Sequence, residues 1–245
     1  MKDVVYSTSN EKKLIQAIQR AVGAYDNGII GTQTLSDAAI ALKADGCWPL
    51  TVQMYGYPVI IAKDLIAFSP KGPLKSYANS MVGSFTYPRA EDPCSILINN
   101  GETVWGTACH AHVGKPESVL YRKKDGTFGV KRAVYWGDLP NDIRWGVGGM
   151  GLLDMYDPEA EGFEGAYADV LRKTDHCVLA VKNGMVYGVY YKAMTAAQIN
   201  KHCRERMRFD IAVLLDGGGL AAINGGEGFA KINAGARQGY ALQFV

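Results

Sequence analysis

The stretch from Ala212 to Gly226, AVLLDGGGLAAINGG, holds the residues best placed to do chemistry. Its apolar start predicts a buried strand, and Asp216 follows at the end of that strand. Gly217–Gly219 come next, and glycines let a ligand approach the backbone while successive N–H groups can bind an anion. A plain turn after a strand explains the same pattern, and the spacing is neither a P-loop nor a dinucleotide-binding fingerprint. Asp216 is therefore a candidate for catalysis or for orienting a substrate.

A second candidate is a pair of histidines, His110 and His112, which stand two positions apart. On a strand, residues at this spacing point to the same face, so the two rings could share a divalent metal or flank a ligand. Glu91, Asp92 or Cys94 could complete such a set. No further ligand spacing supports a metal centre. The sequence therefore predicts no certain cofactor, and a divalent metal stays an open hypothesis.

The elements that must position these residues are mostly strands after residue 47. The dipeptides Asn100-Gly101, Asp125-Gly126 and Asn183-Gly184 predict hairpin turns, because they accept the positive φ of type I′ turns. The clearest hairpin spans His176–Tyr191. A capping-box pattern at Thr195–Gln198 predicts a helix that leads into the strand before Asp216. We therefore expect an α+β fold in residues 47–245, with a largely antiparallel sheet and a few helices.

Residues 1–46 have a different character and predict a small helical module. The segment LIQAIQRAVGAYDNGIIGTQTLSDAAIAL begins at Leu14 and has apolar residues at helical spacing on both sides of a glycine-containing loop. It resembles the three-helix type of peptidoglycan-binding domain, in which a D-G-I-x-G-x-x-T loop joins the helices. Here the loop has one extra residue between Asp26 and Gly28. A helical hairpin that packs on the rest of the chain is the alternative.

The larger region resembles the phosphodiester glycosidase family. The resemblance rests on L-D-G-G-G at 215–219, followed by an Asn and by an Arg before the last strand, and on an R-x-T segment at 172–174 before a hairpin. A glycine-rich segment at 146–153 and the stretch VGSFTYP at 82–88 are similar to two further elements of that family. Three positions depart from its pattern: Val82, Ser84 and Leu220. These changes indicate an altered substrate or lost activity.

The resemblance implies cleavage of a sugar C1–O bond whose oxygen belongs to a phosphodiester. It implies a catalytic or orienting role for Asp216, a phosphate-binding role for Arg172 and a polar contact from Thr174. The substrate-binding residues that it implies are Gly217, Gly218, Gly219, Asn224 and Arg237. For each arginine, a structural or surface ion pair is the alternative.

Composition and charge argue against nucleic acid and membrane as binding partners. The formal charge is +2 and the basic clusters are short, so we expect no nucleic-acid binding. No apolar run approaches the roughly 20 residues of a membrane helix, so we expect no membrane insertion. The five cysteines, Cys47, Cys94, Cys109, Cys177 and Cys203, are an odd number without CxxC spacing, which favours buried thiols over a disulfide framework.

These features together predict a hydrolase that acts on the bacterial cell wall. The small module would bind peptidoglycan or a wall polymer, and the main domain would cleave a sugar phosphodiester of the teichoic-acid type. The N-terminus has no apolar signal-peptide core, so we expect synthesis in the cytoplasm and action after lysis or within a virion, as in a phage or prophage protein. The alternatives are a non-catalytic wall-binding or virion structural protein, and a peptidoglycan hydrolase.

Overall fold

The computed structural model describes residues 48–70, 72–86, 92–226, 231–235 and 239–245, with a few isolated positions before residue 48. Among the isolated positions, β1 (Val4–Val5) and β2 (Ile29–Ile30) pair antiparallel. Gln16, Gln19 and Arg20 are helical and Gly23 lies in a turn, whereas the remaining residues of the predicted module, Cys47 and Arg237 lie outside the described residues. The peptidoglycan-binding character of the module therefore stays a prediction.

The larger of the two main sheets has ten strands, and their order is β10-β9-β11-β14-β12-β13-β4-β3, with β7 and β8 joined beside β11. Neighbouring strands run antiparallel. Their bounds are β3 (Leu50–Met54), β4 (Tyr57–Ala62), β7 (Leu97–Asn99), β8 (Glu102–Trp105), β9 (Glu117–Lys123), β10 (Phe128–Ala133), β11 (Ile143–Gly151), β12 (Thr174–Lys182), β13 (Met185–Met194) and β14 (Ile211–Gly217). β14 thus lies inside the sheet, between β11 and β12.

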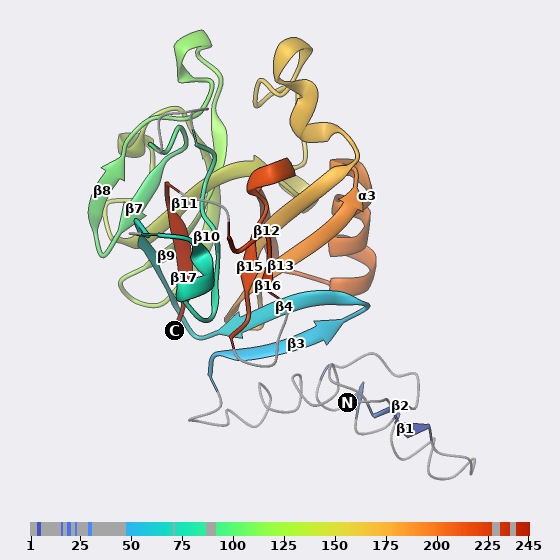
Figure 1. Ribbon diagram of the computed structural model, residues 1–245. Coiled ribbons are helices and arrows are strands. Elements are labelled where there is room, and N and C mark those ends of the chain that lie inside the picture. Colours follow the sequence, from blue (N-terminus) through green and yellow to red (C-terminus); the bar gives the residue numbers. More distant parts are fainter. Residues whose placement is uncertain are drawn as a thin grey trace.

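The smaller sheet has five antiparallel strands in the order β16-β15-β6-β17-β5. Their bounds are β5 (Leu65–Phe68), β6 (Ser80–Val82), β15 (Ile223–Asn224), β16 (Lys231–Ile232) and β17 (Ala241–Phe244). Helix α3 (Ala196–His202) lies beside β12 and β13 and continues into a π-helical turn, Cys203–Met207 (Figure 1). In the part of the chain that is described, no helix combines the length and apolar character needed to cross a membrane.

Residues of β14 alternate between two hydrophobic clusters, which explains why its sequence is apolar without a break. Ala212 and Leu214 face a cluster that includes Ile199 and Met207 from the α3 region. Val213 and Leu215 face the opposite cluster, to which the smaller sheet contributes several residues, among them Met81, Leu242 and Phe244. A strand covered on both faces cannot show polar alternation. The larger sheet is therefore the middle layer, with α3 on one face and the smaller sheet on the other.

The predicted hairpins and helix start are confirmed. Asn183 and Gly184 turn between β12 and β13 with φ of 52° and 73°. Thr195 caps α3, since its side chain accepts the N–H of Gln198 while the Gln198 side chain accepts the N–H of Thr195. The antiparallel sheet is also confirmed. Within the described ranges the expected few helices reduce to α3 and single 3-10 or π turns.

We predict that Gly149→Ala destabilises the fold. A Cβ at position 149 would lie 2.4 Å from the Leu214 carbonyl oxygen of β14, and backbone cannot move aside cheaply. Overpacking of this kind costs about 1–3 kcal/mol, which urea denaturation would measure as a lower free energy of unfolding. Gly137→Ala is the control, because a Cβ there meets no atom within 4 Å. Equal stabilities of the two variants would contradict this packing.

Candidate active site

A pocket of about 710 Å³ opens at the end of β14. It brings Asp216 and the glycines that follow it together with Arg172 and Thr174, which stand at the start of β12. Its other walls come from the 3-10 helix Gly165–Leu171, from the segment around Phe85 and from the residues around His110. Of the predicted catalytic residues, Asp216, Arg172 and Thr174 therefore share one cavity, as do the three glycines.

The carboxylate of Asp216 is held by two donors and largely removed from water. Its Oδ1 accepts the Gly217 N–H at 2.8 Å, and its Oδ2 accepts the Thr86 hydroxyl at 3.1 Å. Burial raises the pKa of Asp216 to about 6, the charge of Asp169 adds to this, and the bonds from Gly217 and Thr86 oppose it. A carboxyl group that titrates near neutral pH can give or take a proton during a reaction.

The structure requires glycine at two of the three positions after Asp216 and leaves open space at the third. A Cβ on Gly217 would lie 2.8 Å from the His176 ring, so the strand pairing requires glycine there. Gly218 adopts a positive φ of 62°, which other residues rarely adopt. Gly219 meets no atom within 4 Å and lies at the pocket. The backbone of this turn is therefore open to an approaching ligand.

Register shifts in the pairing of β12 with its two neighbours orient its first residues toward the pocket. Its pairing with β13 shifts between Thr174 and His176, and its pairing with β14 shifts between His176 and Val178. Bulges of this kind bend a strand and redirect its side chains. Arg172 lies just before the strand, exposed to solvent at the wall of the pocket. Its guanidinium is therefore available to an anion that enters.

His176 is fully buried behind the pocket and lies against Gly217. Its Nε2–H can donate to the Arg172 carbonyl oxygen at 3.2 Å, which fixes the ring and leaves Nδ1 as an acceptor. Burial lowers the pKa of His176, so the ring is neutral near pH 7. Within the described residues Nδ1 has no hydrogen-bond partner. The ring is packed against the Gly217 backbone and held by the Arg172 carbonyl oxygen, so we assign His176 a structural role.

Aromatic rings form part of the pocket wall. The rings of Phe85 and Phe163 lie 5.6 Å apart, and the ring of His110 lies 4.9 Å from Phe163 and 4.6 Å from Tyr167. Flat apolar rings beside a few polar groups are typical of pockets that bind small molecules. We refer to Phe85, His110, Phe163 and Tyr167 as the aromatic wall.

The prediction that His110 and His112 share a strand face is wrong. His110 caps a 3-10 helix, Ala111–Val113, because the chain turns here through a left-handed Gly114 instead of extending. Both rings still line the pocket, with centroids 6.4 Å apart. Among the described residues, no group of three or more His, Cys, Asp or Glu side chains could hold a metal ion.

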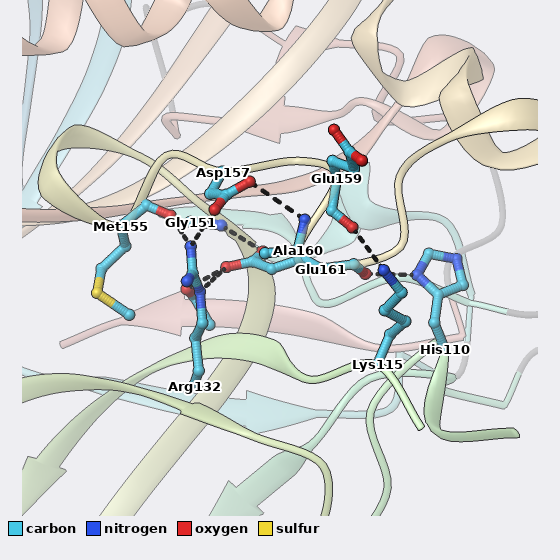
Figure 2. A network of polar contacts seen from close by, with 10 residues as sticks. His110, Lys115, Arg132, Gly151, Met155, Asp157, Glu159, Ala160 and Glu161 are labelled. Carbon is cyan, nitrogen blue, oxygen red and sulfur yellow. Dashed lines mark hydrogen bonds and ion pairs between the residues drawn. The ribbon is translucent and has the colours of Figure 1, made fainter. Parts of the chain in front are cut away.

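A buried carboxylate network fixes His110 (Figure 2). The His110 ring donates from Nδ1 to the Glu161 carbonyl oxygen at 2.9 Å, and burial lowers its pKa. The Glu161 side chain is itself held by the Ser118 hydroxyl, the Gly151 N–H and Arg132. The nitrogen of His110 that remains for a ligand is therefore Nε2.

Asn224, a predicted substrate contact, does not line the pocket. Asn224 is 1% exposed, and its Nδ2 donates to the carbonyl oxygens of Leu74 and Tyr77 at 3.0 and 2.8 Å. Its Oδ1 accepts the Gly226 N–H, so the amide joins loop segments instead of reaching a ligand. Asn224 is corrected to a structural residue. Arg237 lies outside the described residues.

Sequence reasoning missed several residues of the pocket. Phe163, Tyr167 and Asp169 come from a segment that carries no motif. Phe85 and Thr86 lie in the VGSFTYP stretch but carry no predicted role, and the role predicted for His110 is only a metal or flanking ligand contact. Cys94 and Cys109 also line the pocket, with sulfur atoms 3.3 Å apart. The odd number of cysteines gave no sign of this pairing.

No family model matches the sequence, and no curated protein matches it. Several solved structures share the fold. A hypothetical protein from Synechocystis matches with a TM-score of 0.57 and 13% identity, over 79% of this chain and 60% of that one. The catalytic domain of zebrafish N-acetylglucosamine-1-phosphodiester alpha-N-acetylglucosaminidase, auto-inhibited by its pro-peptide, matches with a TM-score of 0.56 and 14% identity, over 79% and 80%. This chain thus spans about three fifths of the Synechocystis protein.

We predict that Asp216→Asn stabilises the protein above pH 6. The pKa of Asp216 is 3.8 in the unfolded chain and about 6 in the native state. Between these pH values the native state holds a proton that the unfolded state has released. The free energy of unfolding therefore falls as the pH rises from 3.8 to about 6. The loss is at most about 3 kcal/mol, since one pKa unit is worth about 1.4 kcal/mol and Asp216 keeps some exposure.

Urea denaturation of the native protein and the variant, above pH 7 and below pH 3.8, would measure this difference. The gain from Asp216→Asn should vanish at the lower pH, where the acid is protonated in both states. Asp154→Asn, on an exposed ion pair with Arg204, should change stability little. A gain of the same size at both pH values would show that ionisation is not its cause.

Proposed function

We propose that the pocket hydrolyses a sugar phosphodiester at the bond between C1 and the phosphate oxygen. The observation that carries this proposal is one cavity that holds a carboxyl group with a pKa of about 6 beside an exposed guanidinium and an open glycine turn. The fold that it shares with the catalytic domain of a phosphodiester glycosidase supports the same reaction.

The demands of this reaction fit the polar groups of the pocket. A phosphate monoester leaves readily, so protonation of the leaving group matters less than in an ordinary glycosidase. The site must instead stabilise phosphate charge and an oxocarbenium-like sugar. Arg172 can bind two phosphate oxygens at once, and the N–H groups of Gly218 and Gly219 can donate to a third.

Asp216 acts as the base in this scheme. Above pH 6 its carboxylate is mostly ionised and takes a proton from the water that attacks C1. The bonds from Thr86 and Gly217 fix the plane of the carboxylate and use one lone pair on each oxygen. A lone pair on one oxygen therefore remains for the water. Thr174, whose hydroxyl lies near Gly218, would contact the substrate as well.

The aromatic wall provides a surface for the apolar face of a sugar ring. It lines the same cavity as Asp216, so a ring that packs on it can present C1 to the carboxylate. Leu220, which departs from the glycosidase pattern, also lines the cavity, whereas Val82 and Ser84 are fully buried away from its lining. The change most able to alter the substrate is therefore Leu220.

We extend the proposal to a wall polymer of the teichoic-acid type as substrate. Its support is the predicted peptidoglycan-binding module, which would keep the enzyme at the cell wall. Action there after lysis, as in a phage or prophage protein, belongs to this extension. Sedimentation of the full chain with purified cell walls, beside a chain that starts at Trp48, tests it.

We predict that the protein releases free sugar from a sugar-1-phosphodiester such as UDP-GlcNAc, and that Asp216→Asn loses about 10²–10⁴-fold in kcat through loss of the base. Arg172→Lys should raise KM and lower kcat, because an ammonium group cannot bind phosphate through two parallel bonds. The neighbouring Lys173→Ala is the matched control and should keep activity. Sugar release, measured by chromatography, is the readout.

Two further arms make the result decisive. The rate of the native protein should rise about tenfold per pH unit below pH 6 and level off above it, as the carboxylate ionises. An EDTA arm tests the open metal hypothesis at His110 and His112. Native activity in Asp216→Asn would contradict the proposed base. A lack of turnover across sugar-1-phosphodiesters would favour a non-catalytic binding protein.

A further inference from the structure

Cys94 and Cys109 form a thiol pair in the wall of the pocket. Their sulfur atoms lie 3.3 Å apart, whereas the other described cysteines, Cys177 and Cys203, contact the Ala222 carbonyl oxygen and the Tyr191 hydroxyl. Cys94 is 4% exposed, and Cys109 is more open to the cavity. Both cysteines line the pocket, and Cys109 is the more accessible of the two.

A single buried carboxylate holds both backbones in place. Glu117 accepts the hydroxyl of Ser95, which follows Cys94, at 2.7 Å and also the Ile96 N–H. Its Oε2 accepts the Cys109 N–H at 3.3 Å as well. The Cys94 N–H donates in turn to the Phe85 carbonyl oxygen at 2.8 Å. The two segments therefore keep their separation while the side chains rotate.

A disulfide fits this separation. Because an S–S bond is about 2.05 Å long, the sulfur atoms need to approach by only about 1.2 Å from their 3.3 Å contact. Rotation about the two Cα–Cβ bonds can supply an approach of that size. The closed loop would contain the β7–β8 hairpin, whose ends already lie together.

The two thiols are chemically unequal. The contact between the two sulfur atoms lowers the pKa of Cys109, whereas the same contact and burial raise the pKa of Cys94. A thiolate is the reactive form of cysteine. Cys109, the more exposed partner, is therefore the sulfur that reacts first. Cys94 is positioned to attack the oxidised Cys109 sulfur and form the disulfide.

We propose that Cys94 and Cys109 are a redox-active dithiol that a peroxide or a small-molecule disulfide converts reversibly to a Cys94–Cys109 disulfide. With a peroxide, the Cys109 thiolate attacks one oxygen, the O–O bond breaks, hydroxide leaves and a sulfenic acid forms. The Cys94 sulfur then attacks the Cys109 sulfur, its proton leaves, the S–O bond breaks and water departs. Two thiols lose two electrons and two protons, and one hydrogen peroxide becomes two waters. With a small-molecule disulfide, the Cys109 thiolate attacks one of its sulfur atoms and releases one thiolate. The Cys94 sulfur then attacks the Cys109 sulfur and releases the second, so the reagent leaves as two thiols.

The proposal does not depend on the proposed hydrolysis, because it needs only the two sulfur atoms, their fixed backbones and an oxidant. The test exposes the full chain separately to hydrogen peroxide and to oxidised glutathione, alkylates the remaining thiols and maps the peptides by mass spectrometry. We expect the peptides of Cys94 and Cys109 joined with a loss of about 2 Da, and separated again by dithiothreitol.

Variants identify the roles of the two thiols. In Cys94→Ser, Cys109 should accumulate a mixed disulfide with glutathione, whereas in Cys109→Ser the buried Cys94 should stay unmodified. Cys203→Ser is the matched control and should still form the linked peptide. If both thiols of the native protein remain fully alkylatable after both oxidants, or if the linked peptide joins another pair, the proposal is overturned. The native measurement alone decides this, whether or not a variant folds.

Discussion

The structure depends on the burial of β14 on both faces. Its side chains contribute to two hydrophobic clusters, and its backbone pairs with β11 on one side and β12 on the other. A strand held in this way ends at a fixed point, and Asp216 stands at that point. Because the surrounding layers exclude water, the carboxyl group is partly desolvated and its pKa rises to about 6. The feature that makes Asp216 chemically useful is therefore a consequence of the same burial that stabilises the sheet.

Buried carboxylates then fix the loops around this strand end. Glu117 joins the segment of Ser95 and Ile96 to Cys109, and Glu161 joins Ser118, Gly151 and Arg132. Burial raises the pKa of both carboxyl groups, and their hydrogen bonds oppose that rise. Loops without regular structure of their own need such attachments to present side chains with a defined geometry. The thiol pair and His110 both depend on them.

The sequence predicted the parts of this protein that local patterns determine. The Asn183-Gly184 turn, the cap at Thr195 and the strand before Asp216 follow from turn propensity, capping and apolar runs, which need no knowledge of distant residues. The turn around His110 was missed because Gly114 ends the extended path, and spacing alone cannot show that. Asn224 was assigned to the substrate because the motif contains it, whereas its amide is used by two backbone carbonyl groups. Thr86, Asp169 and the Cys94–Cys109 pair could not be predicted, because only the packing of the sheet and its loops brings them to Asp216.

The most direct measurement of the central claim is a crystal structure of the protein with a non-hydrolysable phosphonate analogue of a sugar-1-phosphodiester. The account predicts that the phosphonate oxygens lie within hydrogen-bond distance of the Arg172 guanidinium and of the N–H groups after Asp216, and that the sugar packs on the aromatic wall with C1 facing the Asp216 carboxylate. A ligand bound elsewhere, or one in the pocket with its phosphonate away from Arg172, would contradict the account.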